Sequence, residues 1–173
     1  MLVVLEGCDG TGKTTLANML SKVMNAEIVH CSQYTPNDYS FFHGIIEASK
    51  ERNIIADRFC YGQFVYQEEC DRPLAVKEGS EHNVVIGNDV YQFDNGVPAM
   101  KMLHILETEM LQAGAKVIHV VAPIDEIKDR LQARREYVIN SLTVEEVVAR
   151  FRGTFNMSIL QVEEINTGGY QYG

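Results

Sequence analysis

Near the N-terminus the chain reads Gly7-Cys8-Asp9-Gly10-Thr11-Gly12-Lys13-Thr14, and these eight residues are the strongest indication of its fold. It matches the pattern G-x-x-x-x-G-K-[ST] at every fixed position. Glycine lets the backbone turn tightly enough for successive N–H groups to face phosphate oxygens, and a helix that starts here adds its positive end. Lys13 supplies a charge for the β- and γ-phosphates, and Thr14 offers a hydroxyl to Mg²⁺. The stretch therefore predicts a phosphate-binding loop between a strand and a helix.

The residues on either side of this loop agree with that prediction. Residues 1–5 form a continuous apolar run, which is typical of a strand buried on both faces of a parallel sheet, and we expect this strand to be the central one. From Lys13 to Val23, apolar residues recur at the spacing of an amphipathic helix. The predicted inward face of that helix consists of Leu16, Met19, Leu20 and Val23.

Strands and helices alternate along the rest of the chain. Apolar runs predict further strands at 26–31, 53–56, 116–122 and 160–167, and helical periodicity covers 39–52, 60–69, 98–113, a segment with Arg130 and Arg134, and a segment behind the capping-box pair Thr143 and Glu146. Gly114 stands where a helix C-cap is expected. Residues 71–95 are interrupted by glycine and proline, and we interpret them as loop-rich.

This alternation predicts the fold class α/β, a three-layer αβα sandwich with a central parallel sheet of about five strands, in one domain over residues 1–173. In such sheets, ligands bind beyond the carboxyl ends of the strands. The loops after Leu5, Cys31, Ala56 and Ala122 should therefore meet at one site.

Composition excludes several classes of protein. With 46% hydrophobic and 23% charged residues the chain is not of a disordered or fibrous type, and it contains no apolar run long enough for a membrane span. A formal net charge of -9 disfavours a nucleic-acid polymer as partner, because such binding requires clustered cations. The four cysteines form no C-x-x-C pair, so we expect reduced thiols and a cytoplasmic location.

Three motifs, in the same order along the chain, resemble the thymidylate kinase group of nucleoside monophosphate kinases. Residues 6–15 resemble the family's E-G-x-D-G-x-G-K-[ST]-T, and Asp57-Arg58-Phe59 followed by Tyr66-Gln67 is similar to its D-R-[YF] and A-Y-Q. Ala122-Pro123, followed by Arg130 and Arg134, resembles the strand and helix that lead into the family's arginine-bearing lid, here at about 130–142.

The resemblance implies a kinase that transfers the γ-phosphate of ATP, with Mg²⁺, to a deoxynucleoside monophosphate, with thymidylate or a broader range as acceptor. ATP would be held by Gly7, Asp9, Gly10, Thr11, Gly12, Lys13, Thr14 and Thr15. Thr14 and Asp57 would hold the metal and its water shell, and the cations for catalysis would be Lys13, Arg58, Arg130 and Arg134. Small-molecule nucleotides would be the partners, with a homodimer as a further expectation.

The resemblance also gives the acceptor side its residues. Asp9 would accept a hydrogen bond from the sugar 3'-hydroxyl, and Arg58 would bridge the acceptor phosphate. Gln63 would read the base edge, Tyr66 would lie beneath the sugar and exclude a 2'-hydroxyl, and Gln67 completes the motif. Three structural interpretations stay open: a buried Asp57–Arg58 ion pair, Tyr66 as a core aromatic, and the lid arginines as an exposed basic helix face.

One departure from the family keeps a second function open. Residues 32–36 read Ser-Gln-Tyr-Thr-Pro, without the cation that the family places before the proline. A free deoxynucleoside, which has no phosphate to grip, is therefore an alternative acceptor. A regulator that binds ATP without transferring phosphate is a second alternative, although such a sensor would need neither Asp57 and Arg58 nor a basic lid.

Overall fold

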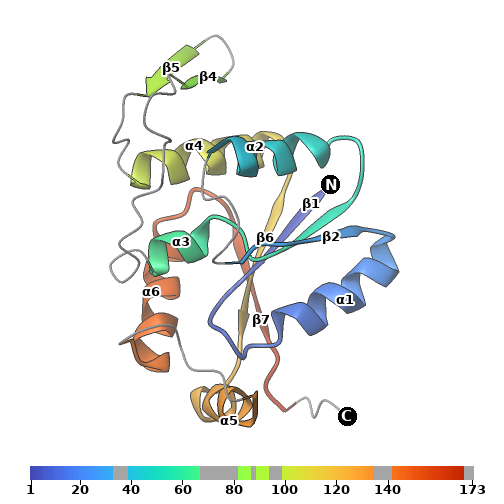
Figure 1. Cartoon of the computed structure of the whole chain (residues 1–173), viewed down its shortest axis with the longest axis vertical. Helices are drawn as coiled ribbons and strands as arrows, with labels where there is room; N and C mark the ends of the chain where they lie inside the picture. The colour runs from blue at the N-terminus through green and yellow to red at the C-terminus, as the bar shows by residue number, and fades with distance from the viewer. Residues whose placement is uncertain (33–38, 67–81, 87–88, 94–98, 135–141, 170–173) are drawn as a thin grey trace.

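The structure is a computed structural model, which describes residues 1–32, 39–66, 82–86, 89–93, 99–134 and 142–169. Its centre is a five-stranded sheet in the order β2-β3-β1-β6-β7, and every pairing in it is parallel (Figure 1). The strands are β1 (Leu2–Glu6), β2 (Glu27–His30), β3 (Ile54–Asp57), β6 (Lys116–Val121) and β7 (Val162–Asn166). The predicted parallel sheet of about five strands with β1 in the middle is confirmed.

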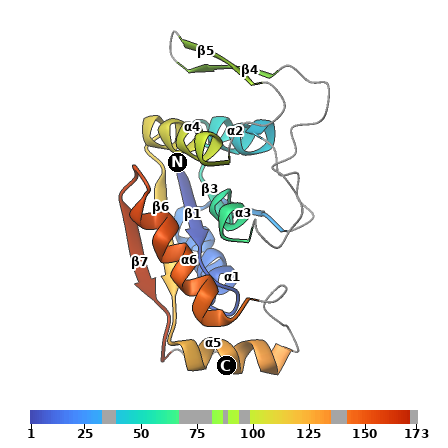
Figure 2. The ribbon, with the colours of Figure 1, turned by 90° about the vertical axis from the view of Figure 1, so that its left-hand side faces the viewer.

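Helices cover the sheet on both sides, which makes the predicted αβα sandwich (Figure 2). One face packs against α1 (Lys13–Met24) through Val3, Leu5 and Ile55. The other face, with Leu2, Val4 and Ile54, forms the larger core. Residues of α2 (Tyr39–Ala48), α3 (Tyr61–Val65), α4 (Ala99–Gln112) and α6 (Val144–Asn156) pack into that core, and Ile127 and Leu131 of the helix after β6 join them. Helix α5 (Ile124–Arg134) follows β6 and lies beyond the carboxyl ends of the strands (Figure 2).

The predicted inward face of α1 is partly wrong. Met19 is 60% exposed and Val23 is 85% exposed. Ala17 is fully buried instead, with Leu20 and Met24 packed beside it. The helix is therefore rotated from the predicted orientation, because the small side chain of Ala17 allows the helix to lie close to the sheet. Apolar spacing alone cannot show which edge of an apolar stripe faces inward.

The prediction of a loop-rich segment at 71–95 is also wrong in part. Strands β4 (His82–Ile86) and β5 (Asp89–Phe93) pair in antiparallel fashion as a two-stranded sheet. They lie on the far side of α2 and α4 from the main sheet (Figures 1 and 2). Residues 87 and 88, between the two strands, lie outside the described residues.

Helix ends follow the predicted signals. Thr143 Oγ1 accepts a hydrogen bond from the Glu146 N–H, and the Glu146 carboxylate accepts one from the Thr143 N–H, so the capping box is confirmed. Gly114 has a φ of 65° just beyond α4, as a left-handed C-cap requires. In the part of the chain that the structure describes, no helix is both long and apolar enough to cross a membrane.

Candidate active site

The loop between β1 and α1 has the close contacts that its glycines allow. Gly7 has a φ of 145°, and a Cβ at this position would lie 2.3 Å from the carbonyl oxygen of Val120. Only glycine fits there, and the loop can therefore lie directly against β6. Lys13 is 5% exposed, and its Nζ donates to the carbonyl oxygens of Gly7 and Cys8 at 2.8 Å each. Burial lowers the pKa of Lys13, and the nearby Asp9 carboxylate opposes that shift.

A hydroxyl and a carboxylate meet beside this loop. Thr14 Oγ1 donates to Asp57 Oδ2 at 2.7 Å, and the second carboxylate oxygen of Asp57 is buried without a hydrogen-bond partner among the described residues. The register Leu5↔Asp57 brings the end of β3 next to the end of β1. Oxygen ligands of this kind suit Mg²⁺. The described residues contain no group of three or more His, Cys, Asp or Glu that could hold a metal alone, so water and phosphate would supply the other ligands.

Arg58 adopts a conformation that is unusual for a residue with a side chain. Its φ is 70°, in the left-handed region, while its N–H donates to the Leu5 carbonyl oxygen at 2.9 Å. The guanidinium forms a hydrogen-bonded ion pair with Asp9. The alternative of a buried Asp57–Arg58 ion pair is therefore wrong, because Arg58 points to the phosphate-binding loop and Asp57 to Thr14.

Glu6 holds the turn that carries Arg58. It is 1% exposed, and its Oε1 accepts hydrogen bonds from the N–H groups of Phe59 at 2.7 Å and Gly62 at 3.2 Å. Burial raises the pKa of Glu6 to about 7, against the opposing effect of those N–H groups and of Lys13 and Arg58. Sequence reasoning quoted Glu6 only as part of a motif. The sequence contained one signal for its role: Glu6 is a charged residue at the end of a buried strand, and such a residue needs a specific partner.

Lys13, Thr14 and Arg58 line one cavity of about 220 Å³. Its wall contains Asp9, Gly10, Gly12, Lys13, Thr14, Thr15, His30, Arg58 and Arg134. Sequence reasoning named all of these except His30. The Nδ1 of His30 lies 3.0 Å from Asp57 Oδ2, because the two residues are paired in register on β2 and β3. A histidine at the carboxyl end of a strand next to the Asp57 strand was the signal available in the sequence.

The two predicted lid arginines occupy different places. Arg130 NH1 donates to the Gly10 carbonyl oxygen at 3.2 Å, and its NH2 donates to the Thr167 carbonyl oxygen at 3.2 Å and to Glu126 at 2.9 Å. Arg134 is exposed and lines the 220 Å³ cavity. Arg130 thus braces the loop between β1 and α1, whereas Arg134 lies on the cavity wall. Residues 135–141 of the predicted lid lie outside the described residues.

The predicted base and sugar residues are on or near α3. The Tyr66 ring packs edge-on against Phe151, and its hydroxyl is buried without a described hydrogen-bond partner. Burial and the nearby Asp9 carboxylate raise the pKa of Tyr66. Tyr66 therefore has both a core contact and a polar tip near the site. Gln63 is half-buried and lines neither the 220 Å³ cavity nor the 240 Å³ cavity described below, and Gln67 lies outside the described residues.

Comparison with known proteins shows the fold. No family model matches the chain, and no curated protein matches it in sequence. The YorR protein of Bacillus subtilis, solved in complex with phosphorylated GDP, has a TM-score of 0.71 and 23% identity over 96% of this chain and 86% of that chain. Deoxyadenosine kinase from M. mycoides with bound dATP has a TM-score of 0.52, with 13% identity over 96% and 91%. Thymidylate kinase from Candida albicans has a TM-score of 0.51, with 13% identity over 98% and 84%. The chain therefore has the P-loop αβα fold that nucleotide kinases use.

Proposed function

We propose that the chain is a kinase that transfers the γ-phosphate of ATP, with Mg²⁺, to a deoxynucleoside monophosphate. The observation that carries this proposal is the position of Arg58. A strained turn holds its guanidinium at the Asp9 carboxylate, on the wall of the cavity that also contains Lys13. A residue in left-handed conformation costs about 1 kcal/mol or more, and such strain is typical of functional positions. A cation held there is placed to bind a second phosphate beside the ATP.

The donor half of the site rests on the loop and on α1. Backbone N–H groups of the glycine-rich loop and the start of α1 would hold the β- and γ-phosphates. Lys13 already donates hydrogen bonds to the Gly7 and Cys8 carbonyl oxygens, so it would be positioned in advance at the phosphates. Thr14 and Asp57 would hold Mg²⁺, partly through water. When bound, the metal would neutralise charge on the phosphates.

In the acceptor half, Arg58 and Asp9 would exchange their mutual ion pair for contacts with the bound acceptor. In the free protein the two side chains neutralise each other. A monophosphate would offer Arg58 a doubly charged partner, and the sugar 3'-hydroxyl would offer Asp9 a donor. An oxygen of the acceptor phosphate would then attack the γ-phosphorus, and the bond to the oxygen that bridges the β- and γ-phosphates would break. Arg134 would stabilise the charge that spreads over the transferred group, and Arg130 would keep the Gly10 backbone in place.

Tyr66 supports a preference for deoxyribose. Its hydroxyl is buried and unpartnered among the described residues, and Asp9 is close enough to raise its pKa. The Tyr66 ring packs against Phe151 and lies near Asp9, the residue proposed to accept a hydrogen bond from the sugar 3'-hydroxyl. A ring in this position would leave little room for a 2'-hydroxyl. The structural neighbours include a thymidylate kinase and a deoxyadenosine kinase, whose names agree with a deoxynucleotide or deoxynucleoside acceptor. We expect the enzyme to act in the cytoplasm.

His30 favours the alternative acceptor, a free deoxynucleoside. A sugar hydroxyl must lose a proton when it attacks, whereas a phosphate oxygen is already ionised. His30 lies at the cavity wall, half exposed, and the Asp57 carboxylate orients its ring. A nucleoside kinase would use such a residue near the attacking hydroxyl. Arg58, however, would then have no acceptor charge to bind.

The test is ADP release from Mg-ATP in a coupled assay, with deoxynucleoside monophosphates, their ribose counterparts and free deoxynucleosides. Turnover with one or more deoxy monophosphates is the expected result and identifies the base. Turnover with free deoxynucleosides alone would replace the proposal by the nucleoside kinase. ATP binding without turnover on any acceptor would indicate a regulator.

A further inference from the structure

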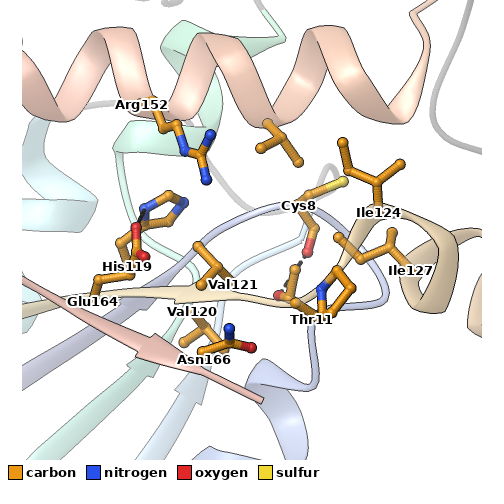
Figure 3. A pocket seen from close by; sticks show the side chains of 13 residues that line it. Cys8, Thr11, His119, Val120, Val121, Ile124, Ile127, Arg152, Glu164 and Asn166 are labelled. Atoms are coloured by element: carbon orange, nitrogen blue, oxygen red, sulfur yellow. Dashed lines mark hydrogen bonds and ion pairs between the residues drawn. The ribbon is translucent and has the colours of Figure 1, made fainter. Parts of the chain in front are cut away.

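A second cavity, of about 240 Å³, lies behind the phosphate-binding loop (Figure 3). Its walls come from β6, β7, the first turn of α5 and the face of α6 that looks onto the sheet. Cys8 and Thr11 contribute to it from the loop, and it shares no lining residue with the 220 Å³ cavity that contains Lys13. The loop therefore has a separate cavity on each side.

One end of this second cavity is apolar. Cys8, Val121, Ile124, Ile127 and Val148 surround it. Burial raises the pKa of the Cys8 thiol to about 12, so at neutral pH the thiol is an uncharged, soft surface. A ring or a branched hydrocarbon group would replace water there favourably.

The other end carries an arginine that has no counter-ion among the residues that the structure describes. Arg152 extends from α6 toward His119 (Figure 3). Glu164, a carboxylate that lines this cavity, lies 3.5 Å from the Nδ1 of His119. Within the described ranges, Arg152 has no hydrogen bond and no ion pair, although its charge lowers the pKa of His119 after the larger effect of burial. Its guanidinium thus has five N–H donors available beside the apolar end of the cavity.

We propose that this second cavity is a binding site for a small aromatic anion, with a ring in the apolar end and a carboxylate or phosphate on Arg152. A planar guanidinium binds such groups in bidentate fashion. Pockets for drug-sized ligands start at about 300 Å³, so the cavity suits a single-ring molecule rather than a nucleoside triphosphate. A bound ring would touch Cys8, whose carbonyl oxygen accepts from Lys13 Nζ and from Thr11 Oγ1. The site is therefore in direct contact with the backbone that positions Lys13.

Benzoate is the probe, and methyl NMR of the full chain is the measurement. Increasing benzoate should shift the methyl signals of Ile124 and Ile127 along a saturable curve. Benzamide has the same ring without the charge, and it should bind at least tenfold more weakly. Arg152→Gln should weaken benzoate binding at least tenfold, whereas Lys116→Gln, which removes a cation from the other end of β6, should leave it unchanged.

A second pair of variants separates the two cavities. Arg134→Gln removes one of the two arginines that line the Lys13 cavity, and it should not weaken benzoate binding. Val148→Trp should fill the apolar end and abolish the shifts, with circular dichroism to verify that the variant folds. The proposal is overturned if benzoate causes no saturable shift, if benzamide binds as well, or if Arg134→Gln weakens binding while Arg152→Gln does not.

Discussion

Thr14 Oγ1 lies 2.7 Å from Asp57 Oδ2, although 43 positions separate the two residues in sequence. The contact exists because β1 and β3 are neighbours in the sheet, so the residues after Leu5 and the end of β3 meet at one edge. In the donor half of the proposed site, this hydroxyl and carboxylate would be the protein's ligands for Mg²⁺. The role of Asp57 can be tested by removing its charge while a hydrogen-bonding oxygen is kept.

Asp57→Asn should raise the Mg²⁺ concentration needed for half-maximal turnover by about tenfold or more, because it removes the negative charge from the metal side of the site. The amide oxygen can still accept from Thr14. ADP release as a function of Mg²⁺ concentration is the measurement. Glu47→Gln is the control, since that carboxylate pairs with Lys50 on the surface. An unchanged Mg²⁺ curve for Asp57→Asn would remove Asp57 from the metal site.

Lys13→Ala should lower turnover by about a hundredfold to a thousandfold, because a preorganised cation is lost from the transferred phosphate. The loss should appear in kcat at saturating ATP. Lys22→Ala, on the last turn of the same helix, should leave turnover unchanged. Thermal unfolding of both variants checks that the fold persists, and near-normal turnover of a folded Lys13→Ala would contradict the proposed function.

Arg58→Ala should weaken binding of a deoxynucleoside monophosphate at least tenfold more than binding of the matching deoxynucleoside, because only the former presents charge to the guanidinium. Calorimetric titration of both ligands gives the two losses. Arg58→Lys retains the charge but not the planar fork, so it should restore part of the difference. Equal losses for both ligands would show that Arg58 does not bind the acceptor phosphate.

Glu6→Gln tests the raised pKa of a buried carboxyl. The pKa of Glu6 is raised from 4.5 to about 7, so folding favours the protonated form. Its contribution to stability is therefore complete below about pH 4.5, and it is lost as the pH rises through 7. A shift of this size corresponds to about 3 kcal/mol, since one pKa unit is about 1.4 kcal/mol.

Denaturant unfolding at a series of pH values measures that effect. Between pH 4.5 and 7.5, the free energy of unfolding of the natural chain should fall relative to that of Glu6→Gln, which cannot ionise. Parallel curves for the two proteins would mean that Glu6 has an ordinary pKa. Glu163→Gln, at an exposed position of β7, is the control and should run parallel to the natural chain.

The sequence predicted those parts of the site in which one local pattern fixes both backbone and chemistry. Gly7, Gly12 and Lys13 belong to one continuous loop, and Asp57 follows a strand that is apolar throughout. His30 was missed because its importance depends on register with Asp57 across two strands, which no local pattern shows. The partner of Arg58 was uncertain for a related reason, since it depends on a left-handed turn that residue types do not reveal.

The other features could not be predicted, because they depend on how a helix is rotated and on contacts between residues that are far apart in sequence. The apolar spacing of α1 was correct, yet Ala17 rather than Met19 faces the sheet, because burial depends on the helix's rotation as well as on its period. Arg130 and Arg134 lie four residues apart on one helix, and no local pattern separates their roles. The hydrogen bonds from Arg130 to Gly10 and to Thr167, which are distant in sequence, distinguish it from Arg134 at the cavity wall.

The central position of β1 has a consequence for how a kinase of the proposed kind could evolve. Strand β3 brings the proposed acceptor-side residues to one flank of β1, and β6 leads to the arginine helix on the other. Each group of residues reaches the candidate site through its own connection, so insertions or substitutions in one connection would leave the other in register. Under the proposed function, a lineage with this arrangement could exchange the molecule that it phosphorylates while inheriting its phosphate donor unchanged.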